Sequence, residues 1–185
     1  CNADLFDRYG LELPTTWERL VAAVEVFRAN GVLPIAVSLS DVPHYIAEFC
    51  IAASGSPQAQ AMRPQTPEEV PESWFRGMAL IRELYRMGAF SEEVNATTEA
   101  SASQMFRDKR AAMQVDGSWF ANSLSAKSME TTVVLPFPPF ADDAEPSYIY
   151  GVSMGFYLTR SAWNDPQRRD AAVDLLRYLT TGENA

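Results

Sequence analysis

Two proline-rich stretches constrain the fold of this chain more than any other feature of its sequence. The prolines of the first stretch, between residues 55 and 71, are Pro57, Pro64, Pro67 and Pro71. Because proline lacks a backbone N–H and clashes with the preceding helical turn, a continuous helix cannot cross this stretch, and we expect a long surface loop. The prolines of the second stretch are Pro136, Pro138 and Pro139, which predict a stiff, extended connection.

Amphipathic helices are predicted on both sides of the first stretch. Thr15 is placed to cap a helix that follows Pro14, and Glu18 three residues later completes a capping box. The apolar stripe of this helix consists of Trp17, Leu20, Val21, Val24 and Phe27. Residues 72–87 predict a second helix, which Gly88 ends. Its apolar stripe consists of Trp74, Met78, Ile81 and Tyr85.

Short apolar segments predict strands between the remaining helices. These strands are expected over residues 34–39, 111–115, 131–135 and 148–159. Helices are expected over residues 41–54, with Asp41 as the cap, over 98–108, and from Ser118 onward. The last helix begins at Asp165-Pro166, and its buried stripe is expected to be Ala172, Leu175, Leu176 and Leu179.

The charge of the chain excludes several classes of partner. It carries 15 basic and 24 acidic residues, so its formal net charge is −9. A negative charge of this size repels phosphate backbones and anionic lipid surfaces, and nucleic acid is therefore not an expected partner. No stretch approaches the roughly 20 apolar residues that cross a bilayer. No basic segment followed by an apolar one opens the chain like a signal peptide, so any export signal is expected to be missing.

Five separated signals occur in a fixed order along nearly the whole chain. They are Asn2-Ala3-Asp4-Leu5-Phe6 with Tyr9-Gly10 and Pro14-Thr15-Thr16-Trp17; Phe106 with Ala111-Ala112-Met113 and Gly117-Ser118-Trp119; Leu135-Pro136-Phe137-Pro138; Tyr150-Gly151; and the final helix ending in Leu179-Thr180-Thr181-Gly182-Glu183. Together they resemble the bacterial extracellular solute-binding proteins that capture sugars, of which maltose-binding protein is a relative. Each signal alone is weak, and their shared order makes the resemblance specific.

The resemblance implies a fold and a division of the chain. The fold is α/β, of the type II periplasmic-binding-protein kind. Residues 1–135 are expected to form a helix-rich second lobe, 136–146 the hinge crossover, and 147–185 a returning segment of the first lobe. The family's opening βα units and closing helices are absent, so the chain is expected to be a fragment. The family usually has glycine where Lys109 stands, and the turn at Lys109 is expected to be built differently.

The cysteines and the single histidine give no metal or redox signal. Cys1 and Cys50 lack the spacing of a metal site or a thiol redox pair, and a disulfide between them is left open. Cys1 could be the lipid-modified cysteine of a lipoprotein, but it runs straight into an element from the middle of the family. His44 finds no second histidine for a metal site or a catalytic relay. We expect no metal and no cofactor.

Sugar binding needs flat aromatic faces for the pyranose ring and polar groups for its hydroxyls. The resemblance gives the first role to Trp119, directly after a predicted strand and the Gly117-Ser118 turn, and to Tyr45 on the helix after residues 34–39. A place in the core is the alternative for both rings.

Polar neighbours of these rings complete the candidate site. Asp41, His44, Gly117 and Ser118 are close in sequence, and backbone N–H groups at such turns can donate to ligand oxygens. Helix capping is the alternative for Asp41, and a solvated position is the alternative for His44. Tyr150-Gly151 is expected to reach the cleft from the other side, with a strand bulge as the alternative.

The expected function is the substrate-binding component of an ABC importer. It would bind a sugar or oligosaccharide between its lobes and deliver it to the membrane permease subunits, as a monomer that is not an enzyme. The expected location is the periplasm or the cell exterior, with a lipoprotein tether possible in the full-length protein. The alternative is a carbohydrate-active hydrolase that uses Asp41 and Asp116.

Overall fold

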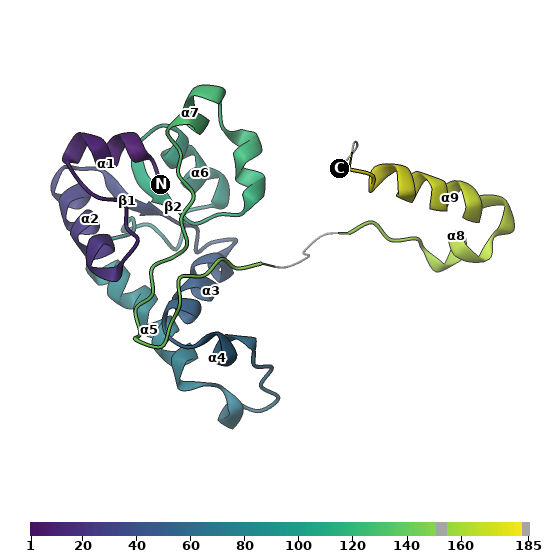
Figure 1. Ribbon diagram of the computed structural model, residues 1–185, viewed down its shortest axis with the longest axis horizontal. Coiled ribbons are helices and arrows are strands. Elements are labelled where there is room, and N and C mark those ends of the chain that lie inside the picture. The colour runs from purple at the N-terminus through teal and green to yellow at the C-terminus, as the bar shows by residue number, and fades with distance from the viewer. Residues whose placement is uncertain (151–154, 183–185) are drawn as a thin grey trace. The chain divides into compact units, whose positions relative to one another are not determined.

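The chain folds into two compact units, Cys1–Ile149 and Tyr150–Ala185. The computed structural model describes residues 1–150 and 155–182 (Figure 1). The predicted division at residues 135 and 147 stays a prediction, and the two units are described separately.

Two parallel strands form the centre of the first unit. β1 (Leu33–Ala36) pairs with β2 (Ala111–Gln114), with Leu33 opposite Ala111 and Ile35 opposite Met113. Parallel strands need a long crossover, and here it contains four α-helices, α3 to α6. The predicted strands over 34–39 and 111–115 are therefore confirmed, each within a few residues.

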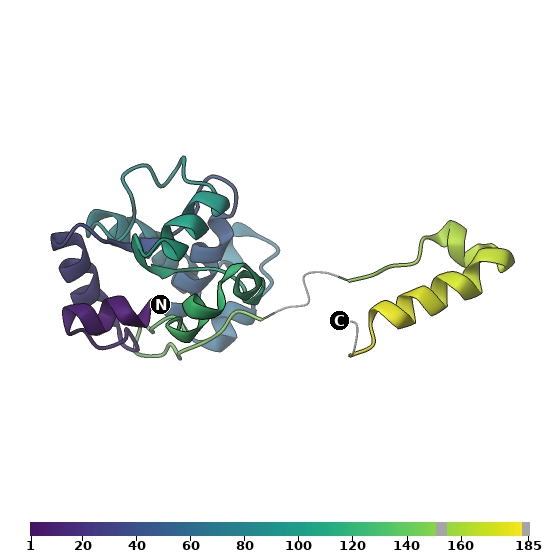
Figure 2. The same cartoon turned by 90° about the horizontal axis from the view of Figure 1, so that it is seen from above.

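Helices surround this pair of strands. Their bounds are α1 (Ala3–Tyr9), α2 (Trp17–Ala29), α3 (Pro43–Ala53), α4 (Pro57–Ala61), the 3-10 turn η1 (Pro67–Glu69), α5 (Glu72–Arg86), α6 (Glu99–Arg107), the 3-10 helix η2 (Ser118–Ser123) and α7 (Ala126–Glu130). α6 packs against both strands, α2 packs against β1, and α3 packs against α5. Figures 1 and 2 show how the helices enclose the short strands.

Phe27 lies at the centre of the hydrophobic core. The ring of Phe6 meets it edge-on at 5.0 Å between centroids, and Tyr9 does so at 5.6 Å. Leu20 and Val24 of the same helix are also buried, which confirms most of the predicted α2 stripe. The predicted cap is wrong by one residue: the hydroxyl of Thr16, and not Thr15, accepts the backbone N–H of Arg19.

The buried face of α5 differs from the predicted stripe. Its buried residues are Ser73, Gly77, Leu80 and Leu84. Met78 and Tyr85 are 54% and 43% exposed. A Cβ on Gly77 would collide with the backbone of Ile51, so α3 and α5 approach through small residues. A search for large apolar residues at helical spacing misses such a face.

The structure differs from the prediction in the first proline-rich stretch and just before the second one. The expected loop between residues 55 and 71 contains the short helices α4 and η1. The expected strand over 131–135 is wrong, because Thr132 forms only a single antiparallel bridge, with Asn2. The extended connection after it is part of the first unit and lies against the end of α3, where Phe140 N donates to Ala53 O at 2.8 Å.

Lys109 takes a left-handed conformation, with φ +58°, that glycine adopts more easily. Its Nζ donates to Asn2 Oδ1 at 2.6 Å, Asp4 Oδ1 at 2.9 Å and Thr131 Oγ1 at 2.9 Å. The backbone therefore adopts the turn that a glycine would favour. The side chain connects its own turn to the residues before and within α1 and to Thr131 after α7.

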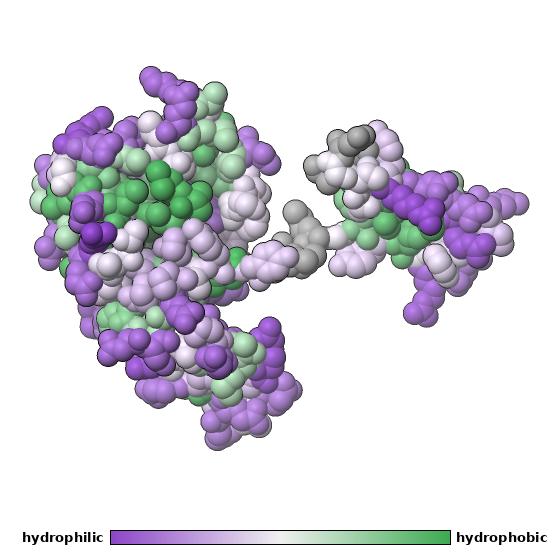
Figure 3. Space-filling view, viewed as in Figure 1, coloured by the Kyte–Doolittle hydropathy of each residue, from purple (hydrophilic) through white to green (hydrophobic). Residues whose placement is uncertain are grey.

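The second unit contains α8 (Arg160–Asn164) and α9 (Pro166–Leu179). As predicted, Asp165 caps α9 by accepting the N–H of Gln167 at 2.9 Å. The predicted stripe of α9 is not buried, and Leu175 is 59% exposed. No strand forms in the described parts of 148–159. None of the described helices has the length and apolar character to cross a bilayer. Figure 3 shows apolar surface on the first unit over α1 and β2.

Candidate ligand-binding edge of the sheet

The two parallel strands end at one edge of the sheet, and the predicted site residues follow them. Residues 37–42 lead from β1 into α3, and residues 115–117 lead from β2 into η2. In α/β folds, ligands bind outside the carboxyl ends of the strands. We call this side the carboxyl edge, and the side where both strands begin the amino edge.

Tyr45 and Trp119 lie next to each other at the carboxyl edge. Their ring centroids are 5.8 Å apart and the rings are tilted by 53°. Trp119 is 47% exposed and Tyr45 is partly buried, so the core alternative fails for Trp119. His44 meets Tyr45 edge-on at 4.6 Å and is itself exposed. Three aromatic side chains from α3 and η2 thus contact one another in a row, and we call this group the aromatic platform.

Gly117 allows the indole of Trp119 to fold back over the chain. A Cβ at this position would overlap the six-membered ring of Trp119. The ring therefore rests directly on the backbone, and any larger residue would displace it. Ser118, the first residue of η2, is exposed beside it.

Asp116 holds the turn beneath Trp119. Its carboxylate accepts the N–H of Gly117 at 2.7 Å and the amide of Gln114 at 2.6 Å, and it also hydrogen-bonds with the side chain of Trp119. Desolvation by burial nevertheless raises the pKa of Asp116 above its ordinary value. Gln114 Oε1 is buried beside it with no partner among the described residues.

Asp41 caps a helix, but not the one predicted. Its carboxylate accepts the backbone N–H of Glu99, at 2.9 and 3.2 Å from the two oxygens, and so caps α6. α3 has no side-chain cap. The hydrogen bond from Ser38 is the main reason that the pKa of Asp41 is lowered.

Acidic side chains surround Tyr45. Its pKa is raised first by desolvation and then by the negative charges of Glu99, Asp116 and Glu48. Sequence reasoning missed Glu99 and Glu48. Glu48 lies three residues after Tyr45 on α3, so helical spacing could have revealed it, whereas Glu99 is brought in by the fold alone.

The residues predicted for the second wall of the site, Tyr150 and Gly151, belong to the second unit. Tyr150 begins the second unit and is 91% exposed. Gly151 lies outside the described residues. Among the described residues, no three histidine, cysteine, aspartate or glutamate side chains gather as metal ligands. Cys1 and Cys50 are both free thiols.

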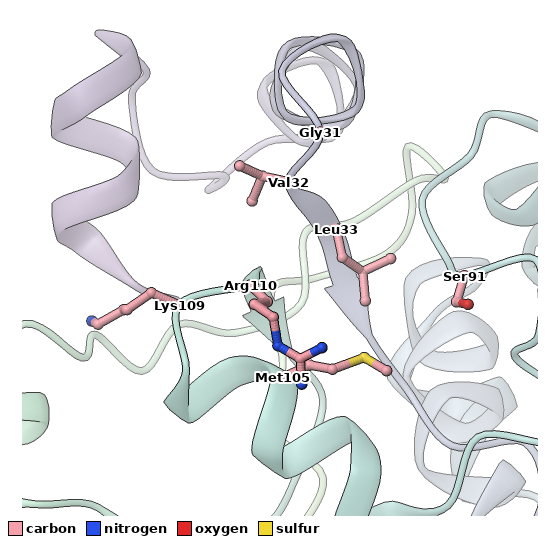
Figure 4. A pocket seen from close by; sticks show the side chains of 7 residues that line it. All are labelled: Gly31, Val32, Leu33, Ser91, Met105, Lys109 and Arg110. Atoms are coloured by element: carbon pink, nitrogen blue, oxygen red, sulfur yellow. The ribbon is translucent and has the colours of Figure 1, made fainter.

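Two shallow hollows open at the amino edge instead. The first, of about 460 Å³, is lined by Gly31, Val32, Leu33, Ser91, Met105, Lys109 and Arg110 (Figure 4). The second, of about 510 Å³, shares Gly31 to Leu33 with it and adds Arg28 and Arg86. In Figure 4, Arg110 and Met105 lie alongside each other near Leu33, while the side chain of Lys109 points away. Among the residues that line the two hollows, Tyr85 is the only exposed aromatic one, so they offer no pair of exposed rings.

A family model described as bacterial extracellular solute-binding protein matches residues 1–185. The chain belongs to this family. No curated protein matches it. Membership of the family confirms the resemblance of the five motifs, and the family consists of solute receptors.

Solved structures of solute-binding proteins share the fold. A chitin oligosaccharide binding protein is 24% identical with a TM-score of 0.65, over 75% of this chain and 36% of its own. A solute-binding lipoprotein described as probable and secreted, from Streptomyces coelicolor, is 25% identical with a TM-score of 0.65, over 75% and 36%. A protein from work on xylan utilization by Caldanaerobius polysaccharolyticus is 20% identical with a TM-score of 0.71, over 96% and 47%. This chain therefore spans about a third to a half of the length of these structures. Its fold is the predicted type II periplasmic-binding-protein fold.

Proposed function

We propose that this chain is part of the substrate-binding component of an ABC importer and contributes one wall of a sugar site. The observation that carries the proposal is the aromatic platform at the carboxyl edge, in which exposed Trp119 lies 5.8 Å from Tyr45. A pyranose ring has an apolar face that packs on such a surface, and its hydroxyls need nearby polar groups. The chitin oligosaccharide binding protein that shares the fold supports this class of ligand.

The local architecture favours a binding surface that exists before the ligand arrives. Gly117 lets the indole rest on the backbone, and Asp116 hydrogen-bonds with it from below. A ring that is already fixed loses little conformational freedom on binding, so more of the contact energy contributes to affinity. The polar groups next to it include the exposed Ser118 and His44.

The delivery step is part of the same proposal. A second lobe would close over the platform, because a ligand that contacts both lobes shifts the population toward the closed form. Tyr150 and Gly151 are proposed to reach the sugar from that side. The closed form would then dock on permease subunits at the membrane, which places the protein in the periplasm or outside the cell, as a monomer.

The hydrolase alternative has weaker support. It needs a carboxylic acid and a carboxylate that are free to face a glycosidic bond. The pKa values of Asp116 and Asp41 do move apart, in opposite directions. Both carboxylates, however, are occupied by structural hydrogen bonds, Asp41 at the start of α6 and Asp116 beneath Trp119. We therefore expect no release of product from chromogenic glycosides.

The test is isothermal titration calorimetry of the complete protein against a panel of mono- and oligosaccharides. We expect at least one sugar to bind with a stoichiometry of one. Trp119→Ala should then weaken binding by about 100-fold, since a buried aromatic contact of this kind contributes about 2 to 3 kcal/mol.

The matched control is Phe75→Ala, which removes another exposed aromatic ring of the first unit, on α5. Its affinity should equal that of the wild type. If no sugar of the panel binds, or if Trp119→Ala binds as tightly as the wild type, the proposal is wrong.

A further inference from the structure

The carboxyl edge holds a group of carboxylates that make no ion pair with a basic side chain of the described residues. Its members are Asp41, Glu48, Glu99 and Asp116. Glu99, Asp116 and Glu48 act on the Tyr45 hydroxyl by their charge, and Asp41 contacts the backbone of Glu99. None of the four makes an ion pair within the part of the chain that the structure describes.

Elsewhere in the chain, some acidic residues do pair with basic side chains. Glu12 pairs with Arg19 at 2.9 Å, Asp4 pairs with Lys109 at 2.9 Å, and Asp108 lies 3.5 Å from Arg110. At the platform the acidic side chains are instead held by neutral donors such as Ser38 and Gln114. Neutral donors fix the position of a carboxylate and leave its negative charge in place.

A second feature at the same place adds an unpaired acceptor to the four carboxylates. Gln114 Oε1 is a buried acceptor with no donor among the described residues, while its Nε2 is used on Asp116 and Ser103. This buried acceptor lies beside Asp116 and no donor of the described residues offsets it, so it adds to the negative potential beneath the platform.

We propose that the platform selects its sugar by charge: it accepts neutral and amino sugars, whose hydroxyl and ammonium groups donate, and it rejects uronic acids. The proposal rests on the proposed function, because it concerns the same ring-binding surface. A uronate carboxylate placed on Trp119 would be close to the unpaired negative charges of Glu99, Glu48 and Asp116. Like charges repel, so this contact would weaken the binding of a uronate. An ammonium group in the same place would be attracted.

The first experiment measures the local charge without any sugar. Fluorescence quenching of the complete protein by caesium and by iodide is compared with that of Trp119→Phe, and the difference between the two proteins isolates the contribution of Trp119 among the four tryptophans. We expect caesium to quench Trp119 at least as well as iodide, although iodide is the more efficient quencher of exposed indole. Glu48→Gln with Glu99→Gln should restore the advantage of iodide, whereas Glu92→Gln on the amino edge should not.

The second experiment measures selectivity by calorimetry at low ionic strength. The probes within each comparison share the same sugar skeleton. The first comparison is between chitotriose, which carries free amines, and its N-acetylated form. The second is between glucose or glucosamine and glucuronate. Where a neutral or amino probe binds, its uronate counterpart should bind at least tenfold more weakly. That difference should shrink in about 1 M salt and in the Glu48→Gln, Glu99→Gln double variant.

The outcomes separate this inference from the proposed function. If uronates bind as tightly as neutral sugars, or if iodide keeps its full advantage at Trp119, charge selection is wrong while the sugar site stands. If none of the sugars binds, the proposed function fails and this inference fails with it.

Discussion

The two edges of one short sheet have opposite chemistry. The carboxyl edge carries the aromatic platform and four unpaired carboxylates, whereas the amino edge carries two shallow hollows lined in part by Arg28, Arg86 and Arg110. The residues that line the hollows include no pair of exposed aromatic rings. In an α/β fold, ligands bind at the carboxyl ends of the strands, so the chemistry of that edge is the better guide to a ligand.

The arginines of the amino edge also have structural roles. Arg28 donates to Met87 O at 3.3 Å and lies against Gly88, where a Cβ would collide with it. Arg110 pairs with Asp108 at 3.5 Å. The amino edge is thus a place where helix ends are tied to the sheet, while the carboxyl edge leaves rings and acceptors open to solvent.

Of the changes that compare the two edges, the largest effect is expected from replacing a glycine at each edge. Gly117→Ala should weaken sugar binding by about 30-fold, about 2 kcal/mol, because the new Cβ occupies the space of the Trp119 indole. Gly31→Ala should leave affinity unchanged and lower the free energy of unfolding by about 1 kcal/mol, because Gly31 has φ +71° in open space. Calorimetry and urea unfolding of the complete protein measure the two effects. Equal loss of affinity in both variants would contradict the assignment of the site to one edge.

The next effect concerns Lys109. Lys109→Met should lower the free energy of unfolding by about 2 kcal/mol, because the hydrogen bonds to Asn2, Asp4 and Thr131 are lost. Lys109→Gly loses the same bonds but relieves the left-handed backbone, and it should be about 1 kcal/mol more stable than Lys109→Met. Arg110→Met is the control, with a change within about 0.5 kcal/mol. A Lys109→Met protein as stable as the wild type would show that the three contacts contribute little.

The smallest effect is a difference in pH dependence within the carboxyl edge. The pKa of Asp116 is raised above its ordinary 3.8 by desolvation, so its contribution to stability is fully present below 3.8 and is lost as the pH rises through the folded pKa. The pKa of Asp41 is lowered, chiefly by Ser38, so its contribution is present above 3.8 and is lost as the pH falls through the folded pKa.

Urea unfolding between about pH 3 and pH 6 tests these signs. The stability of the wild type relative to Asp116→Asn should fall as the pH rises, and its stability relative to Asp41→Asn should rise. Two curves with the same slope would mean that one of the two environments is described wrongly.

Local sequence patterns predicted the elements that depend on local signals. The strands over 33–36 and 111–114, the start of α9 at Asp165 and the turn before Trp119 all follow from residues that are neighbours in sequence. The predictions that failed depend on distant partners. Asp41 caps α6 because the fold brings Glu99 to it, and α5 buries Ser73 and Gly77 because α3 packs there.

The candidate site was predicted in part for the same reason. Trp119 and Tyr45 were predicted from the resemblance, and the structure brings their rings together. The acidic surroundings were not predicted, since Glu99 enters from α6 through a contact with a residue 58 positions earlier. The binding roles of all the predicted site residues stay predictions: Trp119, Tyr45, Asp41, His44, Gly117, Ser118, Tyr150 and Gly151.

A crystal structure of the complete protein with a bound oligosaccharide would show directly which edge holds the sugar. We expect a pyranose ring stacked on Trp119, in contact with Tyr45, at the carboxyl edge of β1 and β2. A sugar seated in the hollow between Val32, Leu33 and Arg110, with Trp119 free of contact, would contradict this expectation.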